Sequence, residues 1–302
     1  MRYLVTGGAG FIGTNLVTEL IKQSHSVVVL DNYVGGRQPD RVVNGVEYVE
    51  GDVRDAAVLD RVCAGVDGIF HMAALPRVSY SVEQPWETHD VNVNGTLQVL
   101  LAAKRQGVKR VVFSSSSATY GEQEVFPLAE DTLIKKPISP YALHKYMGEH
   151  YVRMFAELYG VGGVSLVYFN VYGPHFDPNG PYALVIGKFL EQVKNGQPMT
   201  VSGDGEYFRD YVHVADVVAA NIAAMTSDHV GRGEVINIGT NDPRSVNQLV
   251  ELIGGPSVRV AERAGDGRYF AADIRKAKEL LGWEPTIQIA DGINAMKKEM
   301  GL

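Results

Sequence analysis

Short runs of β-branched residues alternate with segments of helical periodicity through the first half of the chain. The spacing of apolar and polar positions predicts strands at 3–6, 26–30, 46–49, 68–70, 110–113 and 164–169, and helices at 11–22, 55–63, 97–104 and 141–159. Strands that alternate with helices are typical of a parallel sheet covered by helices on both faces. The pattern therefore predicts an α/β fold, a doubly wound parallel sheet, through about residue 168.

The alternation weakens after Asn170, where turn residues cluster at 173–174 and 178–181. Apolar runs at 212–214 and 235–238 resemble buried strands, and helical periodicity returns at 245–253 and 274–281. We expect a first domain over 1–168, to which the chain returns near 210–240. We expect a smaller, partly intertwined C-terminal lobe over 169–302.

The composition is that of an ordinary globular chain. The 302 residues are 45% hydrophobic and 21% charged, and no run approaches the roughly 18 apolar residues of a membrane span. The formal net charge is −7, which disfavours binding to nucleic acid. Cys63 is the single cysteine, so an internal disulfide is excluded, and the first residues lack a signal-sequence pattern. We expect a cytoplasmic protein without nucleic-acid or membrane partners.

Glycine is in excess, at 33 of 302 residues, roughly 11% against the usual 7%. Gly7, Gly10 and Gly13 fall between the first predicted strand and the first predicted helix, which opens with Phe11 and Ile12. Glycines three apart let the backbone turn sharply and approach a pyrophosphate, which the N-terminus of the helix then binds. This turn predicts a Rossmann-type dinucleotide-binding domain, with these five residues at the cofactor.

Residues at the ends of the next strands extend the expected cofactor site. Asp31 lies 18 residues beyond Gly13, where a carboxylate accepts hydrogen bonds from an adenosine ribose. It favours NAD over NADP, because a carboxylate would repel a 2′-phosphate. Asp52 either reaches the adenine amino group or forms an Asx turn before Asp55. The other residues expected at the cofactor are Asn32, Val53, Ala73 and Ala74.

A tyrosine and a lysine four residues apart open the long predicted helix. Tyr141 and Lys145 project from one helical face, and a phenol beside an ammonium can act as a base. An unperturbed tyrosine has a pKa near 10, and the ammonium together with a positively charged nicotinamide favours the phenolate. A solvated helix face is the alternative for this pair. Four serines at 114–117 end a nearby strand, where hydroxyls would point into the crevice at the carboxyl edge of the sheet.

Six segments, in order, resemble a known family. They are TGGAGFIG at 6–13, FSSSSATYG at 113–121, YALHK at 141–145, YFNVYGP at 168–174, RDYVHVAD at 209–216 and LGWEP at 281–285. Together they look like the extended short-chain dehydrogenase/reductase family, and within it the UDP-sugar 4-epimerases. The resemblance runs from residue 1 to about residue 298.

The resemblance implies an NAD-dependent isomerase with Ser116, Tyr141 and Lys145 as catalytic residues. Tyr141 would remove the proton of the sugar 4-hydroxyl while the hydrogen on that carbon passes to NAD as a hydride. The resulting 4-keto sugar would rotate and take the hydride back on its opposite face. Lys145 would also bind the cofactor ribose, and Tyr168 would contact the cofactor. Related dehydratases and decarboxylases carry a glutamate where Ala118 stands, so plain epimerisation is favoured.

The resemblance also implies where the UDP-sugar binds. The expected contacts to the nucleotide sugar are Asn170, Ala183 and Leu184, and those to the diphosphate and uridine ribose are Arg209, Arg263 and Asp266. Guanidinium groups suit phosphate oxygens. A surface ion pair between Arg209 and Asp210 is the alternative for the first of these arginines.

Three departures from the family pattern bear on the substrate. Val167 stands where relatives usually carry arginine. Arg77, after Pro76, follows a turn where many relatives have smaller or uncharged residues, and it can reach the sugar ring or a uronate carboxylate. Phe270 stands where the family gates the C2 substituent. Its size favours UDP-glucose and UDP-galactose, whereas Arg77 favours a uronate.

Several alternatives stay open at this point. The substrate is UDP-glucose or UDP-galactose, or else UDP-N-acetylglucosamine or UDP-glucuronate, and a dehydratase, a decarboxylase or a non-enzymatic NAD-binding regulator are further readings. The eight histidines lack paired spacing, so we expect no metal site. The apolar positions at 97–101 and 147–154 either fill the core or form the helix bundle of the homodimer that the resemblance implies.

Overall fold

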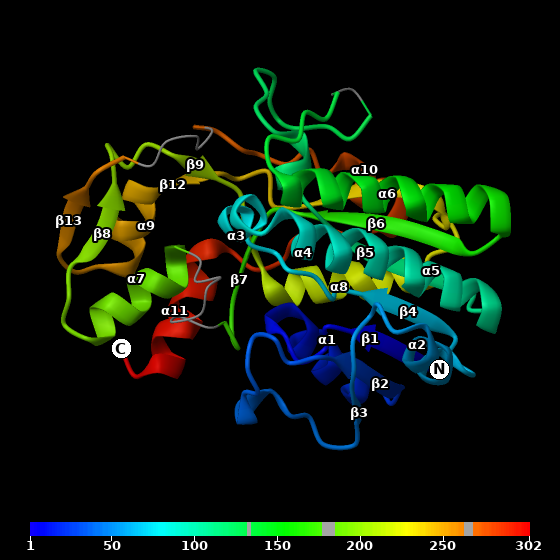
Figure 1. The fold of residues 1–302 in the computed structure, drawn as a ribbon. Coiled ribbons are helices and arrows are strands. Elements are labelled where there is room, and N and C mark those ends of the chain that lie inside the picture. Colours follow the sequence, from blue (N-terminus) through cyan, green and yellow to red (C-terminus); the bar gives the residue numbers. More distant parts are fainter. Residues whose placement is uncertain (132–133, 177–184, 263–267) are drawn as a thin grey trace.

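The computed structural model describes residues 1–131, 134–176, 185–262 and 268–302. Figure 1 shows a large sheet with helices on both sides and, beside it, a smaller lobe. The helices of this lobe are α7 (Val185–Lys194), α9 (Val246–Ile253) and α11 (Ile289–Met300).

Seven parallel strands form the large sheet, in the order β11-β6-β5-β4-β1-β2-β3. They are β1 (Arg2–Thr6), β2 (Ser26–Asp31), β3 (Glu47–Glu50), β4 (Gly68–His71), β5 (Arg110–Ser116), β6 (Gly162–Tyr168) and β11 (Arg232–Ile238). The chain winds outward from β1 to β3, then crosses back to β4 on the other side of β1. This order confirms the doubly wound α/β fold and places a topological switch point, where ligands bind, between β1 and β4.

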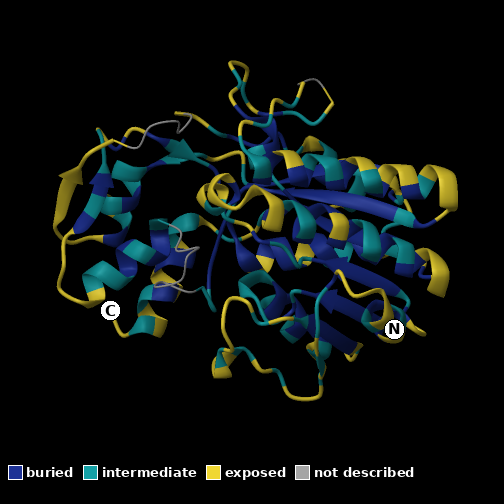
Figure 2. Cartoon of the chain, in the orientation of Figure 1, coloured by how far each residue is buried: buried dark blue, intermediate teal, exposed yellow. Residues whose placement is uncertain are grey.

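Helices cover both faces of this sheet. One face packs against α1 (Phe11–Lys22), α8 (Val214–Thr226) and α10 (Arg275–Leu281), and the other against α2 (Ala56–Cys63), α5 (Gly95–Gln106) and α6 (Pro140–Tyr159). Along β2, Val27 and Val29 pack on the first face and Val28 and Leu30 on the second, because successive strand side chains alternate. Strands that are buried on both faces are apolar along most of their length. Figure 2 shows strands of the large sheet largely in dark blue, the colour of buried residues.

In the part of the chain that the structure describes, three short two-stranded sheets lie outside the large one. Their pairs are β7 (Asn170–Tyr172) with β10 (Tyr211–His213), β8 (Met199–Ser202) with β13 (Ser257–Val260), and β9 (Phe208–Arg209) with β12 (Arg244–Ser245). The apolar run at 235–238 joins the large sheet in β11, next to β6. The run at 212–214 does not join it, because β7 has already left the sheet after Tyr168 and β10 pairs with β7 instead.

Two of the sequence motifs hold the C-terminal end of the chain to α8. The Asp216 carboxylate accepts hydrogen bonds from the backbone N–H of Thr286 at 3.0 Å and of Ile287 at 3.1 Å. The Trp283 indole donates to the Asp216 carbonyl at 2.9 Å. Asp216 and Trp283 are both buried, so the conspicuous acid and tryptophan of these motifs serve the packing of the fold.

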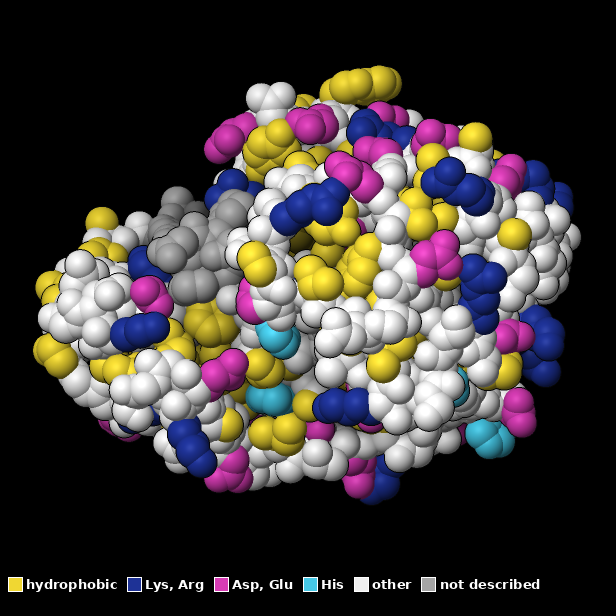
Figure 3. Space-filling model, turned by 90° about the horizontal axis from the view of Figure 1, so that it is seen from below, with side chains coloured by type: hydrophobic (Ala, Val, Ile, Leu, Met, Phe, Trp, Pro, Cys, Tyr) yellow, Lys and Arg dark blue, Asp and Glu magenta, His cyan; other side chains and the backbone are white. Residues whose placement is uncertain are grey.

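The remaining helical segments are short. They are α3 (Val78–Glu83), α4 (Pro85–His89), the π-helical η2 (Asp90–Asn94), and the 3₁₀ turns η1 (Pro39–Arg41) and η3 (Ser117–Tyr120). Within the described ranges, no helix combines the length and apolarity needed to cross a membrane. On the face seen in Figure 3, lysine and arginine side chains are interspersed with aspartate and glutamate.

Candidate active site

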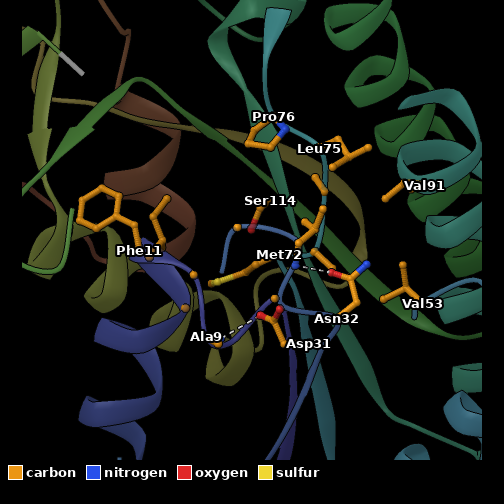
Figure 4. A pocket seen from close by; sticks show the side chains of 18 of the residues that line it. Ala9, Phe11, Asp31, Asn32, Val53, Met72, Leu75, Pro76, Val91 and Ser114 are labelled. Atoms are coloured by element: carbon orange, nitrogen blue, oxygen red, sulfur yellow. Dashed lines mark hydrogen bonds between the residues drawn. The ribbon is translucent and has the colours of Figure 1, made fainter. Parts of the chain in front are cut away.

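A cavity of about 770 Å³ lies at the carboxyl ends of the sheet strands. Its walls come from the turn after β1, the ends of β2 and β5, the connections after β3 and β4, and the first turns of α6. Figure 4 shows Asp31, Asn32 and Ala9 at one end of this space and Ser114 with Met72 further along it. The cavity therefore occupies the crevice where an open α/β sheet binds its ligand.

The turn after β1 brings its backbone to the cavity because glycines occupy most of its positions. Gly7 has φ +70°, and a Cβ there would lie 2.8 Å from the backbone nitrogen of Ala73. A Cβ on Gly13 would lie 2.3 Å from the carbonyl oxygen of Gly7. Gly7, Gly10 and Gly13 all line the cavity, as do Phe11 and Ile12. The N-terminus of α1 is thereby left open to a pyrophosphate.

Replacing Gly7 with alanine is expected to abolish cofactor retention, because the new methyl group must push the turn away from Ala73. Gly65→Ala is a matched control: Gly65 has nearly the same φ, +68°, but open space around its Cβ position. We expect the control to cost roughly 1–2 kcal/mol of stability through its backbone conformation alone and to keep its cofactor. Thermal denaturation and the content of bound NAD measure both. Equal NAD content in the two variants would contradict the close-approach account.

Asp31 ends β2 beside the glycine turn. Its carboxylate accepts the backbone N–H of Ala9 at 3.0 Å and of Tyr33 at 2.8 Å. Burial raises the pKa of Asp31, against the lowering by those two hydrogen bonds and by the charge of Arg41. Asn32 also lines the cavity. A carboxylate held at this strand end fits the adenosine ribose of a dinucleotide.

Asp52 forms the Asx turn that its position after β3 allowed. Its carboxylate accepts the backbone N–H of Arg54 at 2.9 Å and pairs with the Arg54 guanidinium at 2.7 Å. These hydrogen bonds lower the pKa of Asp52. Val53 lines the cavity, whereas Asp52 is not among the lining residues. A contact of Asp52 with adenine stays a prediction.

The segment after β4 lies along the cavity and is held from behind. Ala73, Ala74 and Arg77 all line the cavity. Asn92 of η2 accepts the backbone N–H of Leu75 at 2.8 Å and donates to its carbonyl at 3.0 Å. These two hydrogen bonds fix the segment. Arg77, the residue that directly precedes α3, therefore lies at the cavity.

The structure places Tyr141 and Lys145 together in the cavity wall. Ser139 caps α6 by accepting the N–H of Ala142 at 3.2 Å, and the Tyr141 N–H donates to Ser81 at 3.1 Å. Both functional side chains are buried, with 8% and 5% of their surface exposed, so the solvated-face alternative is wrong. Lys145 donates to the carbonyl of Ser114 at 2.7 Å. Burial lowers the pKa of Lys145 to about 8, against the raising effect of Glu149.

A buried ion pair stands behind this lysine. Glu149, one helical turn beyond Lys145, accepts from both Ser115 Oγ at 2.5 Å and Lys135 Nζ at 2.7 Å. The side chains of Lys135 and Glu149 are only 6% and 4% exposed. Ser115 lines the cavity, and its hydroxyl donates its proton in a hydrogen bond to Glu149 of α6.

The other serines at the end of β5 face the opposite side from Ser115. Ser114 Oγ lies 3.1 Å from the Tyr168 hydroxyl, which donates to Asn221 at 2.8 Å. Burial raises the pKa of Tyr168 to about 12, so it stays a phenol. Ser116 Oγ accepts the N–H of Ala118 at 3.3 Å. Ser114 and Tyr168 line the cavity while Ser116 is not among its lining residues, and the catalytic role of Ser116 stays a prediction.

Asn170 and Arg209 of the expected substrate set lie near each other in the chain's tertiary structure. The Asn170 amide donates to the carbonyl of Asp210 at 3.2 Å. Asp210 is fully buried, where its carboxylate accepts from the backbone N–H of Thr240 at 2.6 Å and of Ala272 at 2.9 Å. A surface ion pair between Arg209 and Asp210 is therefore wrong, since Asp210 joins backbone segments in the interior.

Phe270 lies beside Arg209, whose guanidinium carbon is 5.0 Å from the centre of the ring. Phe270 lines a second cavity, of about 810 Å³, together with Phe126 and Tyr269. Val167, where the family pattern has arginine, is fully buried in a cluster with Tyr120, Leu128 and Phe169. At position 167 the valine thus packs in an apolar cluster in place of the arginine of the family pattern. Ala183, Leu184, Arg263 and Asp266 lie outside the described residues.

Some cavity residues were missed by reasoning from the sequence. They are chiefly Tyr33, Gly35, Gly36, Arg41 and Phe176. The Gly35-Gly36 pair after Asp31 was a usable signal, because such a pair lets a backbone approach a ligand. Arg41 and Phe176 gave no local signal, since only the tertiary fold brings them to this site.

These residues fit NAD. The glycine turn leaves space that a Cβ would fill, Asp31 stands at the ribose position, and a tyrosine–lysine pair lies in the same wall. Among the residues described, no group of three or more histidine, cysteine, aspartate or glutamate side chains suits a metal ion. NAD bound here would be held by the turn after β1 and by Asp31, and it would supply an acceptor and donor of hydride.

Comparison with known proteins shows the family of this chain. A model of the NAD dependent epimerase/dehydratase family matches residues 3–239. A UDP-glucose 4-epimerase of Mycolicibacterium smegmatis is 38% identical over 305 residues, covering 97% of this chain and 96% of that protein. The structure of a UDP-glucose 4-epimerase with UDP-glucose from Thermotoga maritima has a TM-score of 0.93 at 39% identity, covering 99% of this chain and 98% of that one.

A second solved structure is similar to almost the same extent. It is a UDP-N-acetylglucosamine 4-epimerase from Methanobrevibacter ruminantium in complex with UDP-N-acetylmuramic acid, with a TM-score of 0.91 at 34% identity, covering 99% of this chain and 98% of that one. The family match extends over more than half of the chain. With the glycine turn, Asp31, and the buried Tyr141 and Lys145 in one cavity, this chain belongs to the NAD dependent epimerase/dehydratase family of extended short-chain dehydrogenases/reductases.

Proposed function

We propose that this chain is a UDP-hexose 4-epimerase that interconverts UDP-galactose and UDP-glucose with NAD as its cofactor. The observation that carries the proposal is the placement of Tyr141 and Lys145 in the cavity formed by the glycine turn. Ala118 stands where related dehydratases and decarboxylases have a glutamate, and with Ser117 before it the pair offers no carboxylate as acid or base for elimination. The similar proteins named as UDP-glucose 4-epimerases support the same reaction.

In the proposed reaction Tyr141 takes the proton of the sugar 4-hydroxyl and returns it after the sugar ring has turned. Lys145 carries its positive charge below about pH 8 and favours the phenolate of Tyr141. Ser116, on the same side of β5 as Ser114, would donate to the sugar oxygen. The dinucleotide would lie over residues 1–168, and the UDP-sugar between them and the lobe formed from 169–302.

Phe270 and Arg77 bear on which UDP-sugar is used. By resemblance to the family, position 270 faces the C2 substituent, where a large aromatic ring would leave little room for an N-acetyl group and favour hexoses with a free 2-hydroxyl. Phe270 lines the second cavity and is not among the residues of the cavity that holds Tyr141. Arg77 lines the cavity and would suit a uronate carboxylate. UDP-glucuronate is therefore the second candidate substrate, and UDP-N-acetylglucosamine the third, because a similar structure is an epimerase of that sugar.

A substrate panel tests the choice. We expect the purified protein to convert UDP-galactose to UDP-glucose with a kcat/KM at least roughly tenfold above those for UDP-N-acetylglucosamine and UDP-glucuronate, because one misfitting group in a pocket is worth about that factor. Products are resolved by anion-exchange chromatography. Phe270→Ser should raise activity on the N-acetylated sugar. Conversion of UDP-glucuronate alone would reassign the substrate to the uronate, and no conversion of any sugar would refute the epimerase proposal.

We further propose a homodimer in the cytoplasm. Met147, Tyr151, Met154 and Leu158 recur along one side of α6, and Met154 and Leu158 are 47% and 64% exposed. The apolar positions there are thus not all core, which supports a helix-bundle interface. The free, buried Cys63 agrees with a reducing compartment. A molar mass of one chain by light scattering would contradict the dimer.

A further inference from the structure

The segment Pro174–Phe176, which follows β7, is tied to the nucleotide-binding domain at two points. The Asn15 amide on α1 donates to the carbonyl of Pro174 at 3.0 Å. The Arg41 guanidinium donates to the carbonyl of His175 at 2.7 Å. The His175 ring also lies 3.4 Å from the Asp40 carboxylate. Two different elements of the first domain therefore hold the same short segment.

The second tie lies at the cofactor cavity through its donor, Arg41, and through Phe176, the neighbour of its acceptor. Arg41 and Phe176 are among the residues that line it. Burial raises the pKa of Asp31, and the nearby positive charge of Arg41 is among the influences that oppose this rise. The bond from Arg41 to His175 thus crosses between two walls of the cavity at the end where Asp31 is placed.

The segment is anchored on its other side to the smaller lobe. The ring of Phe176 packs so closely on Gly187 of α7 that a Cβ there would lie 2.2 Å from a ring carbon. Phe176 also packs at the edge of the apolar cluster of that lobe. Pro174–Phe176 is therefore packed against the smaller lobe, whereas Asn15 and Arg41 belong to the large sheet and its helices.

We propose that Asn15, Arg41 and the segment Pro174–Phe176 form a clasp that retains NAD by fastening the smaller lobe over the adenosine end of the cavity. A guanidinium donating to a carbonyl is a charge-assisted hydrogen bond, and separation of the two walls breaks it together with the Asn15 bond. Asn15 is not among the cavity-lining residues; besides the bond to Pro174, its amide donates to the carbonyl of Phe11 within α1 at 2.9 Å. Retention suits a reaction that returns the cofactor to its starting state at each turnover. The clasp depends on NAD binding and not on which sugar is used.

Exchange of bound NAD against added isotope-labelled NAD tests the clasp. We expect Arg41→Met and Asn15→Ala each to exchange NAD roughly tenfold faster or more than the unaltered protein, the factor typical of losing one such hydrogen bond. Arg37→Met is the matched control. Arg37 lies in the same connection between β2 and β3; it stacks on Tyr33 of the cavity wall and pairs with Glu50, but it is not itself among the residues that line the cavity. Circular dichroism checks that all three variants fold.

The pattern of rates decides the outcome. Faster exchange in both Arg41→Met and Asn15→Ala, with Arg37→Met unchanged, supports the clasp. Faster exchange in Arg41→Met alone would mean that Arg41 holds NAD by direct contact, and unchanged rates in both would mean that the ties do not matter; either result overturns the proposal. An unaltered protein that carries NAD but converts no UDP-sugar would refute the epimerase and leave this test intact.

Discussion

Tyr141→Phe is expected to lower kcat by roughly 10²–10⁴-fold, the usual contribution of a positioned acid–base group. The substitution removes only the phenol oxygen, and the ring keeps its place, 8% exposed in the cavity wall. Bound NAD and the melting temperature should therefore stay close to those of the unaltered protein. Steady-state assay of UDP-galactose conversion, with the NAD content of the same preparations, checks both expectations.

Tyr146→Phe is the control on the same helix. The ring of Tyr146 packs edge-on against His150, with 4.6 Å between ring centres, and it is not among the cavity-lining residues. Its loss of a hydroxyl should leave kcat unchanged. A Tyr141→Phe variant as active as Tyr146→Phe would remove Tyr141 from its role as the base.

Lys145→Met is expected to lower kcat by a similar factor, roughly 10²–10⁴-fold, and to change the pH profile. The folded-state pKa of Lys145 is lowered to about 8 by burial, below the ordinary value of about 10.4. The ammonium is therefore present below pH 8 and is lost as the pH rises through 8. The unaltered protein should lose activity on this alkaline side, and the methionine variant should lack that limb of the curve.

Lys22→Met controls for the loss of a lysine at an exposed site, since the Lys22 side chain is 69% exposed and lies 3.8 Å from Glu19 at the surface. We expect it to leave both kcat and the pH profile as they are. Methionine is apolar and suits the buried position at 145, so the variant should fold. A Lys145→Met profile that keeps its alkaline limb near pH 8 would show that another group titrates there.

The fold followed from local pattern wherever that pattern was strong. The glycine turn and the apolar face of Phe11–Lys22 predicted α1 with its observed bounds, and the apolar runs predicted the inner strands because both faces of the sheet are buried. Helices α3 and α4 were not foreseen. Val82 in α3 is 62% exposed and Trp86 in α4 is 77% exposed, so the apolar residues of these helices do not form a buried face.

The candidate site was predictable where one short segment carries the chemistry. The three glycines Gly7, Gly10 and Gly13, the carboxylate Asp31, and the pair Tyr141 and Lys145 were each predicted from a local spacing, and all of them line one cavity. Contacts between distant segments were not predictable. The hydrogen bond from Arg41 to His175 joins residues that are 134 positions apart. The ion pair of Glu149 is formed with Lys135, which lies in a connection without a periodic pattern of apolar residues. Such pairs are set by tertiary packing, which a single sequence does not encode in its local propensities.

The proposed epimerisation requires that the hydrogen on carbon 4 leaves the sugar and returns to the same carbon while the sugar stays in the NAD-bound protein. UDP-galactose that carries deuterium at C4 tests it directly, in ordinary water and with no NAD added beyond that bound to the protein. We expect the product UDP-glucose to keep its deuterium at C4, as measured by mass spectrometry and by NMR. A product that has exchanged this deuterium for solvent hydrogen, or the absence of any product, would contradict it.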